Sequence, residues 1–227
     1  MMLAAVRIHE RTSTCVSDNG FCPHWIKDHF GDYLGPLARH VELVAASVAC
    51  GFVIAFALGL LAHRRRWLTG PIVGVTGVLY TIPSVALYTV LLPVTGFGFV
   101  TALIALTAYT LLIIFRNVVA GLANVAPEAR DAARGMGLTP RQVLLRVELP
   151  LAVPEIMAGL RVATTTTVGL AALAFLAGAG GLGAKIETDI NFKSNIVVAG
   201  GLCVALAVAL DGLLLAAERL LTPWRRR

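Results

Sequence analysis

Residues 67–115 read WLTGPIVGVTGVLYTIPSVALYTVLLPVTGFGFVTALIALTAYTLLIIF, and these 49 residues contain no Asp, Glu, Lys or Arg. A helix needs about 20 apolar residues to cross the hydrocarbon core of a bilayer, so the stretch is long enough for two crossings. The whole chain has the same character, because 57% of its 227 residues are hydrophobic and only 14% are charged. This composition excludes a soluble globular domain, a disordered chain and a small disulfide-built scaffold. We predict an all-α fold, a polytopic integral membrane helical bundle.

Apolar segments separated by polar or turn-forming residues predict about five transmembrane helices. Pro93–Gly98 forms a turn between the second and third, and Pro83 is expected to kink the second. In the first, Gly51, Ala55 and Gly59 recur at every fourth residue, a spacing that lets helix backbones approach closely in lipid. The alternative is that Gly and Ala are simply common in this chain. The predicted spans are residues 41–62, 71–92, 99–121, 156–177 and 196–217.

The distribution of basic residues predicts the orientation in the membrane. Most of the Lys and Arg residues lie in segments 64–66, 116–161 and 219–227. Cytoplasmic loops carry an excess of Lys and Arg, so we expect the N-terminus outside and the C-terminus inside. The net charge of +6 then reflects topology, and no nucleic acid is expected as a partner. The predicted organisation is an extracytoplasmic segment 1–37, a membrane domain 38–221 with its main cytoplasmic loop at 124–150, and a cytoplasmic basic tail 222–227.

The N-terminal segment shows two further features. Charged residues such as Arg7 and Glu10 interrupt any signal-peptide core, so no cleaved leader is expected. Cys15 and Cys22 permit three interpretations: zinc binding with nearby histidines, a disulfide in an external segment, or no pairing. Their spacing fits no familiar zinc motif, so no metal site is predicted. Apolar and aromatic residues at helical spacing predict an interfacial helix on the outer leaflet: Trp25, Ile26, His29, Phe30, Tyr33 and Leu34.

The loop at 124–150 has the pattern of a docking element. A short amphipathic helix is expected to start near Pro127, a favoured first-turn residue, with Glu128 in its first turn. Ala132 and Ala133 give this helix a slim face, and Gly137 lets the chain turn. A small helix of this kind suits the groove of a partner protein.

The same loop carries a family resemblance. Its pattern is an acid followed by Ala-Ala, three residues, Gly, nine residues, an aliphatic residue, any residue and Leu-Pro, which resembles the EAA loop of importer-type ABC transporter permeases. Asp131 replaces the usual Glu and Val147 the usual Ile. Segments 81–84, 128–183 and 211–223 are similar to the glycine betaine/choline/carnitine subfamily of osmoprotectant permeases. The positions matched in the loop are Asp131, Ala132, Ala133, Gly137, Val147, Leu149 and Pro150.

The resemblance implies a type I ABC importer permease of the bacterial plasma membrane. Its partners would be a second permease subunit (the same or homologous), cytoplasmic ATP-binding subunits, a separate extracytoplasmic solute-binding protein and membrane lipid. The sequence contains no G-x-x-x-x-G-K-[ST] loop. We therefore expect that this chain binds no cofactor directly and that it is not an enzyme. ATP and Mg would be used by the partner ATPase. The residues expected to couple to the ATPase are Glu128, Asp131, Ala132, Ala133, Gly137, Val147, Leu149 and Pro150.

Polar residues inside the predicted spans are candidates for a translocation pathway. The alternative for the threonine run 164–167 is that its hydroxyls bond to carbonyls one turn earlier. Asp211 is expected to be a structural intramembrane residue that either pairs with a cation such as Arg161 or stabilises helix contacts, and substrate contact is a third alternative. Aromatic residues form no cluster along the chain, so solute selection is expected in the binding protein. The pathway candidates are Tyr80, Ser84, Tyr88, Thr164 and Thr167.

The sequence also permits interpretations other than an importer permease. Gly178, Gly180 and Gly183 spell G-x-G-x-x-G, but they follow an apolar span rather than a strand, so nucleotide binding is not expected. A membrane-embedded enzyme is disfavoured, because Asp211 is the only acid clearly inside a predicted span. The alternatives to a compatible-solute importer are a stand-alone osmotically gated channel and a permease for another small solute such as an amino acid.

Overall fold

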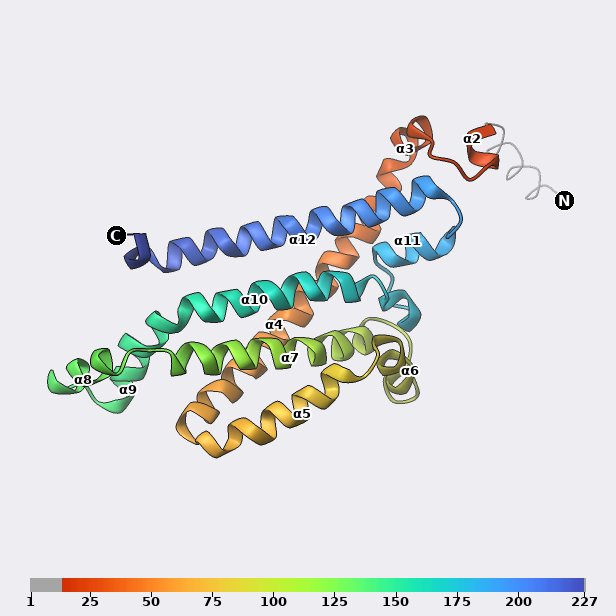
Figure 1. Ribbon diagram of the computed structural model, residues 1–227. Coiled ribbons are helices and arrows are strands. Elements are labelled where there is room, and N and C mark those ends of the chain that lie inside the picture. Colours follow the sequence, from red (N-terminus) through yellow and green to blue (C-terminus); the bar gives the residue numbers. More distant parts are fainter. Residues whose placement is uncertain (1–13, 227) are drawn as a thin grey trace.

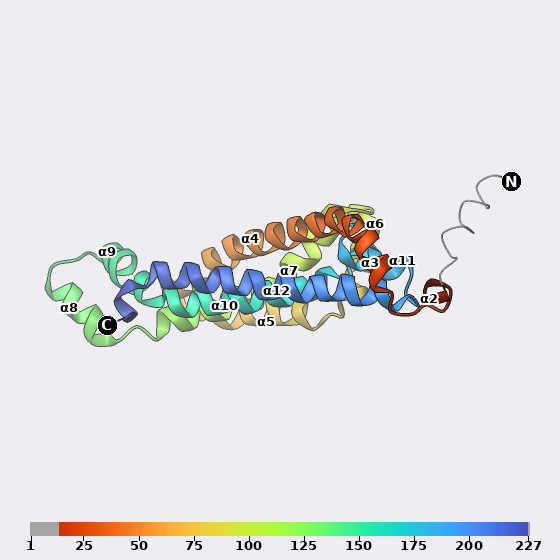
Figure 2. The same ribbon diagram turned by 90° about the horizontal axis from the view of Figure 1, so that it is seen from above.

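A computed structural model describes residues 14–226, and this part of the chain is helical without any strand. Long helices lie side by side in one elongated bundle (Figures 1 and 2). The first described helix, α2 (Thr14–Ser17), and the last, η5 (Pro223–Arg226), lie at opposite ends, as an odd number of crossings predicts. We call these the α11 end and the α8 end, after α11 (Leu182–Thr188) and α8 (Pro127–Gly135). Residues 1–13, which hold the charges that argue against a signal peptide, and Arg227 lie outside the described residues.

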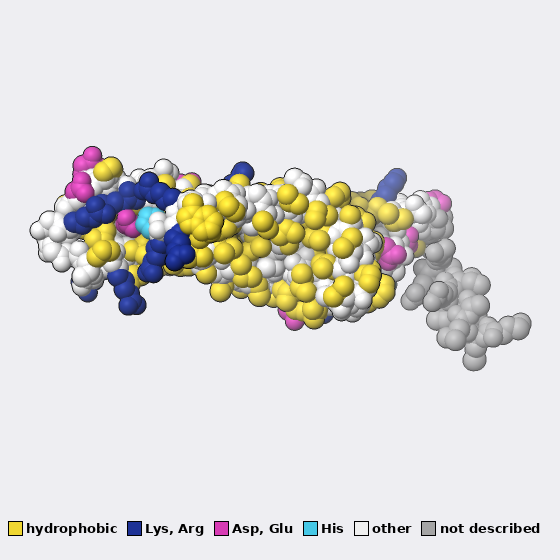
Figure 3. Space-filling model, turned by 90° about the horizontal axis from the view of Figure 1, so that it is seen from below, with side chains coloured by type: hydrophobic (Ala, Val, Ile, Leu, Met, Phe, Trp, Pro, Cys, Tyr) yellow, Lys and Arg dark blue, Asp and Glu magenta, His cyan; other side chains and the backbone are white. Residues whose placement is uncertain are grey.

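Three described segments are long and apolar enough to cross a membrane unaided. The first runs over Pro23–Arg64 and comprises α3 (Pro23–His29), η1 (Phe30–Tyr33) and α4 (Leu34–Arg64). The others are α7 (Phe99–Ala123) and α12 (Lys193–Leu221). They contain the predicted first, third and fifth spans. Figure 3 shows a broad hydrophobic middle on this face, with Lys and Arg gathered mainly toward the α8 end.

The predicted second span is broken. After the turn η2 (Arg66–Leu68), α5 (Thr69–Thr81) and α6 (Ser84–Thr95) meet at 97°. Pro83 takes an extended conformation between them, so the expected kink is a near right angle. A break of this kind frees backbone carbonyls, and the Tyr109 hydroxyl donates a hydrogen bond to the carbonyl of Ile82. The pair still has the length and composition of one crossing.

The predicted fourth span, 156–177, has the wrong bounds. The helix here, α10, runs over Leu149–Ala171, and the chain then turns through η4 (Ala174–Ala177). Side chains satisfy its last carbonyls: His40 binds the Val168 carbonyl at 3.0 Å, and Tyr88 donates to that of Leu170 at 3.3 Å. With Glu155, Arg161 and its threonines, α10 is too polar to qualify as a span on its own among the described helices. Its 23 residues make about 35 Å of helix, and it lies along α7 and α12 (Figure 1). Five crossings therefore stay a prediction.

The long helix α7 lies at the centre of the bundle, and its neighbours approach it at glycines. A Cβ atom on Gly51 of α4 would lie 1.7 Å from Thr110 Oγ1 of α7, and one on Gly59 would lie 2.4 Å from Val118. Ala55, between them, is fully buried. The predicted role of these small residues in packing is confirmed. On a neighbouring part of the α7 surface, a Cβ atom on Gly159 of α10 would lie 2.3 Å from Asn117.

The N-terminal segment is fastened to the start of α12. Cys15 and Cys22 form a disulfide, which resolves the three interpretations left open by the sequence. The Cys22 amide donates to Ser194 Oγ at 2.7 Å, and the Tyr33 hydroxyl donates to Asn195 Oδ1 at 2.7 Å. The predicted interfacial helix is the short α3 followed by η1. Tyr33 is buried against the protein, so part of the predicted apolar face is covered by α12 instead of lipid.

We predict that Gly59→Leu lowers the free energy of unfolding in detergent by about 1–3 kcal/mol, because the side chain must displace Val118 across the α4–α7 contact. Gly212→Leu in α12 is the control, since a Cβ there meets nothing within 4 Å. Equal stability of the two variants would contradict the close-packing role.

Candidate coupling site

The loop expected to dock a partner begins with a well-terminated helix. Pro127 lies in the first turn of α8, Glu128 follows it, and Arg134 lies in the last turn, as the helix dipole favours. Gly137 has a φ of 84°, which favours glycine. The Gly137 and Leu138 amides donate to the carbonyls of Arg134 and Ala133 at 2.9 and 3.2 Å. This pair of bonds is a Schellman motif, which fixes the turn after α8.

The second half of the loop returns the chain to the bundle. Thr139 and Gln142 form a capping box at the start of α9 (Pro140–Val143). The Thr and Gln three residues apart are a visible signal for this helix start, which is not among the features predicted above. The five-residue π-helical turn η3 (Leu144–Glu148) then leads directly into α10. Leu149 packs against the buried cluster at this end of the bundle, and Pro150 lies in the first turn of α10.

The residues predicted to couple divide into an exposed and a buried group. Glu128, Asp131, Ala132 and Gly137 are exposed, and the neighbouring Met136 is 73% exposed. Ala133 differs, because it is 1% exposed and lies against the loop itself. The structure therefore offers a tip with an apolar Met and Ala beside an acid, held on a small internal core. Val147, Leu149 and Pro150 are half-buried at the base of the loop.

A buried carboxylate joins this loop to the bundle. Glu148, only 6% exposed, ends the π-helical turn. Its Oε1 accepts a hydrogen bond from Arg130 Nε of α8 at 2.7 Å, and its Oε2 lies 2.9 Å from His63 Nε2 of α4. Arg130 Nη2 also donates to the Leu122 carbonyl in the last turn of α7 at 2.6 Å. We call His63, Arg130 and Glu148 the Glu148 cluster.

The Glu148 cluster is a mechanical joint as well as an ion pair. It links α8 to α4 and, through the Leu122 carbonyl, to α7, while Glu148 itself adjoins the first residue of α10. Removing one partner of a buried pair leaves an uncompensated charge, which is costly. None of the three residues is predicted from the sequence. Arg130 is 18 residues and His63 is 85 residues from Glu148 along the chain, so no local pattern brings them together.

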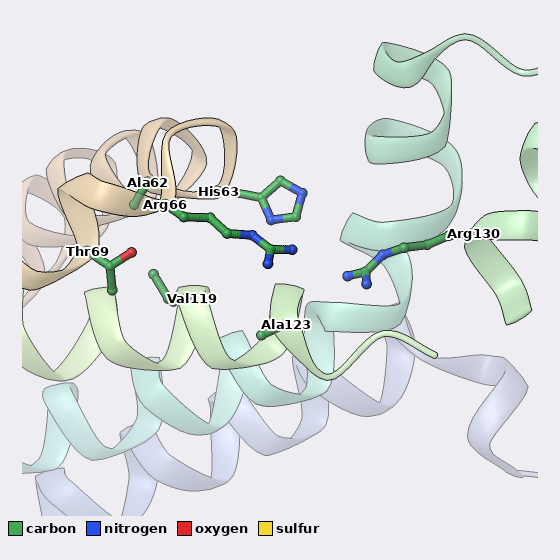
Figure 4. A pocket seen from close by; sticks show the side chains of 7 residues that line it. All are labelled: Ala62, His63, Arg66, Thr69, Val119, Ala123 and Arg130. Atoms are coloured by element: carbon green, nitrogen blue, oxygen red, sulfur yellow. The ribbon is translucent and has the colours of Figure 1, made fainter. Parts of the chain in front are cut away.

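A cavity of about 350 Å³ opens beside the Glu148 cluster. Figure 4 shows that His63 and Arg66 reach into it from the end of α4 and the turn after it, while Arg130 reaches in from the loop. The wall is completed by Thr69 at the start of α5, by Val119 and by the small residues Ala62 and Ala123. The cavity leaves space between the loop and the bundle beside the joint.

The comparisons with known proteins agree with this geometry. Residues 48–221 match the model of the family described as the inner membrane component of binding-protein-dependent transport systems. The chain belongs to this family. The osmoprotectant import permease protein OsmW of Salmonella typhimurium is 38% identical over 88% of this chain and 96% of its own length. The choline transport system permease protein OpuBB of Bacillus subtilis is 35% identical over 88% of this chain and 93% of its own length.

The fold of the permease is that of type I ABC importers. It resembles a chain of the MetNI methionine ABC transporter in an inward-facing conformation with a TM-score of 0.70. The identity is 25%, and the alignment covers 83% of the permease and 94% of that chain. The permease is thus a multi-pass protein of the bacterial inner membrane, and its family is a transport component rather than a catalytic subunit.

The structure places three of the predicted pathway residues around the break at Pro83. Tyr80 is exposed near the end of α5, and its ring meets that of Tyr109 edge-on at 6.1 Å. Ser84 is half-buried at the start of α6. Tyr88 is fully buried and bonds to α10. A pathway role stays a prediction, and in this structure Tyr88 acts as a cap for α10.

The remaining intramembrane candidates lie on α10 and α12 of the permease. Thr164 and Thr167 are buried, and their hydroxyls donate to the Leu160 and Ala163 carbonyls at 2.8 and 2.7 Å. This is the alternative considered from the sequence, in which the hydroxyls bond one turn back. Asp211 accepts two bonds of 2.8 Å from Arg161, which is the pairing alternative considered from the sequence.

We predict that Glu148→Gln lowers the free energy of unfolding of the permease in detergent by about 3 kcal/mol, because Arg130 loses its buried counter-charge. The double variant Glu148→Gln, Arg130→Gln should recover part of this loss, which a double-mutant cycle measures. Glu128→Gln, on the exposed side of the loop, is the control and should change stability by less than about 0.5 kcal/mol. Additive effects of the two cluster substitutions would contradict the joint.

Proposed function

We propose that the chain is the transmembrane permease subunit of an ATP-driven, binding-protein-dependent importer of a compatible solute: glycine betaine, choline, carnitine or proline betaine. The observation that carries the proposal is the docking loop, whose exposed tip is built on α8 and tied to the bundle by the Glu148 cluster. The printed names of OsmW and OpuBB support the solute class.

The proposed mechanism uses the loop as a lever. ATP-driven closure of the partner ATPases moves the exposed tip, where Asp131, Ala132 and Gly137 make contact. Arg130 carries that movement to Glu148, and from there it reaches α4 and α10. Because α7 is held at Leu122 by the same arginine, three helices of the bundle respond to one displacement. The bundle then tilts from inward-open to outward-open, and hydrolysis reverses the change.

The orientation and partners follow from the same loop. The α8 end faces the cytoplasm, where ATP and Mg are used by the partner ATPase, and the permease binds no cofactor directly. The gathering of Lys and Arg toward this end (Figure 3) supports the orientation, with the N-terminus outside. The α11 end meets a separate solute-binding protein. A second permease subunit, the same or homologous, completes the membrane core.

We predict that Gly137→Glu leaves the protein in the membrane but reduces solute uptake at least about tenfold, because a carboxylate is introduced at the docking tip. Gly137→Asn adds a side chain without a charge, and Asn tolerates the positive φ of this position. Comparing it with Gly137→Glu therefore separates the effect of the charge from that of backbone strain. Gly70→Glu, in the first turn of α5 outside the loop, where a Cβ meets nothing within 4 Å, is the control for the added charge. Uptake of labelled glycine betaine, choline and carnitine in cells measures the effect, and normal uptake by Gly137→Glu contradicts the docking role.

Affinity purification of the tagged chain in mild detergent tests the partner. A stoichiometric ATP-binding subunit with ATPase activity, lost in Gly137→Glu, is the expected result. A chain that purifies without any ATPase and conducts ions by itself would favour the osmotically gated channel instead.

A further inference from the structure

Three aromatic side chains that are far apart in the sequence gather at the α11 end. Trp25 comes from α3, Tyr33 from η1, and Phe192 from the residue before α12. They line a cavity of about 210 Å³. Aromatic residues that form no cluster along the sequence therefore do form one in the folded chain. The side chains from the N-terminal segment reach Phe192 because that segment is fastened to the start of α12.

The aromatic walls are packed against the rest of the protein, since Tyr33 is 1% exposed and Phe192 is 4% exposed. The rings of Trp25 and Phe192 meet at 82° with centroids 4.7 Å apart, and His29 stacks on Trp25 at 4.5 Å. Tyr33 is held through its hydroxyl by Asn195, whose amide donates to the Lys185 carbonyl. A preorganised site loses little conformational freedom on binding. The corner formed by Trp25 and Phe192 thus suits a small rounded group better than a flat one.

The charged groups around the cavity are of both signs. Asp32 and Asp189 contribute carboxylates, and Lys185 contributes an ammonium group that lies 5.5 Å from the centroid of the Tyr33 ring. Aromatic faces attract cations, and quaternary ammonium groups are bound in this way. A carboxylate would be attracted by Lys185. A ligand with both charges and a small volume satisfies all of these groups at once.

We propose that this cavity binds a small quaternary-ammonium carboxylate, a betaine-type zwitterion, at the end of the permease opposite the docking loop. Its trimethylammonium group lies against the aromatic corner beside Asp32 and Asp189, and its carboxylate lies toward Lys185. The choice of this zwitterion rests on the proposed function, whereas the preference for a cation beside an anion rests on the cavity itself. The site would hold solute weakly at the face where the binding protein delivers it.

Fluorescence of Trp25 tests the site in the purified full-length chain. Trp67→Phe and Trp224→Phe leave Trp25 as the single indole, since the chain has three tryptophans. We expect glycine betaine to change its emission saturably. The comparison ligand is 3,3-dimethylbutanoate, which has the same shape and carboxylate with carbon in place of the charged nitrogen. We expect it to bind about tenfold more weakly, because the cation–π attraction is absent.

Two variants at the rim separate recognition from folding. Asp32→Asn, at an exposed position, should weaken glycine betaine binding severalfold. We expect glycine betaine to bind better than choline, which has no carboxylate for Lys185, and Lys185→Gln should remove this difference. Asp28→Asn and Lys193→Gln are matched controls that change the same charges outside the cavity. Equal binding of 3,3-dimethylbutanoate, no saturable change with glycine betaine, or equal effects of variants and controls would overturn the proposal.

Comparing binding at Trp25 with solute uptake tests the cavity and the proposed importer function separately. Gly137→Glu should abolish uptake and leave binding at Trp25 intact. Uptake without binding at Trp25 would overturn the site and leave the importer standing, whereas binding without uptake by the unmodified protein would overturn the importer and leave the site.

Discussion

Close contact between helix backbones along α7 is the constraint on which the rest of this structure depends. In a bilayer, lipid tails solvate apolar side chains as well as another helix does, so helix association relies on packing and hydrogen bonds. Gly51 and Gly59 bring α4 against α7, and Gly159 brings α10 against it. Because α4 and α10 are placed by these contacts, His63 and Glu148 at their α8 ends come within hydrogen-bonding distance.

The Glu148 cluster converts that packing into a connection with the docking loop. An exposed helix on a flexible loop would transmit little force, whereas α8 is held by Arg130 to both Glu148 and the end of α7. The Schellman turn at Gly137 and the capping box at Thr139 keep the loop itself in one shape. The tip and the bundle are therefore mechanically continuous, as the proposed coupling to a partner ATPase requires.

Polar side chains have a second role in the bundle. They form hydrogen bonds with backbone carbonyls where a helix ends within it. Tyr109 satisfies the break after α5, while His40 and Tyr88 satisfy the end of α10. Unpaired backbone groups are expensive where water is absent. Residues that look like pathway candidates in the sequence thus include some, such as Tyr88, whose observed contacts are structural.

The sequence predicts the membrane class, the family motif of the loop at 124–150 and the packing face of the first span. Each of these depends on local composition or on a fixed spacing. The folded chain adds the right angle at Pro83, the end of α10 at Ala171, the Glu148 cluster and the aromatic cavity at the α11 end. Tyr33 and Asn195, for example, are 162 residues apart. Hydropathy and motif spacing report on neighbours along the chain, whereas these features arise where packed helices bring distant side chains together.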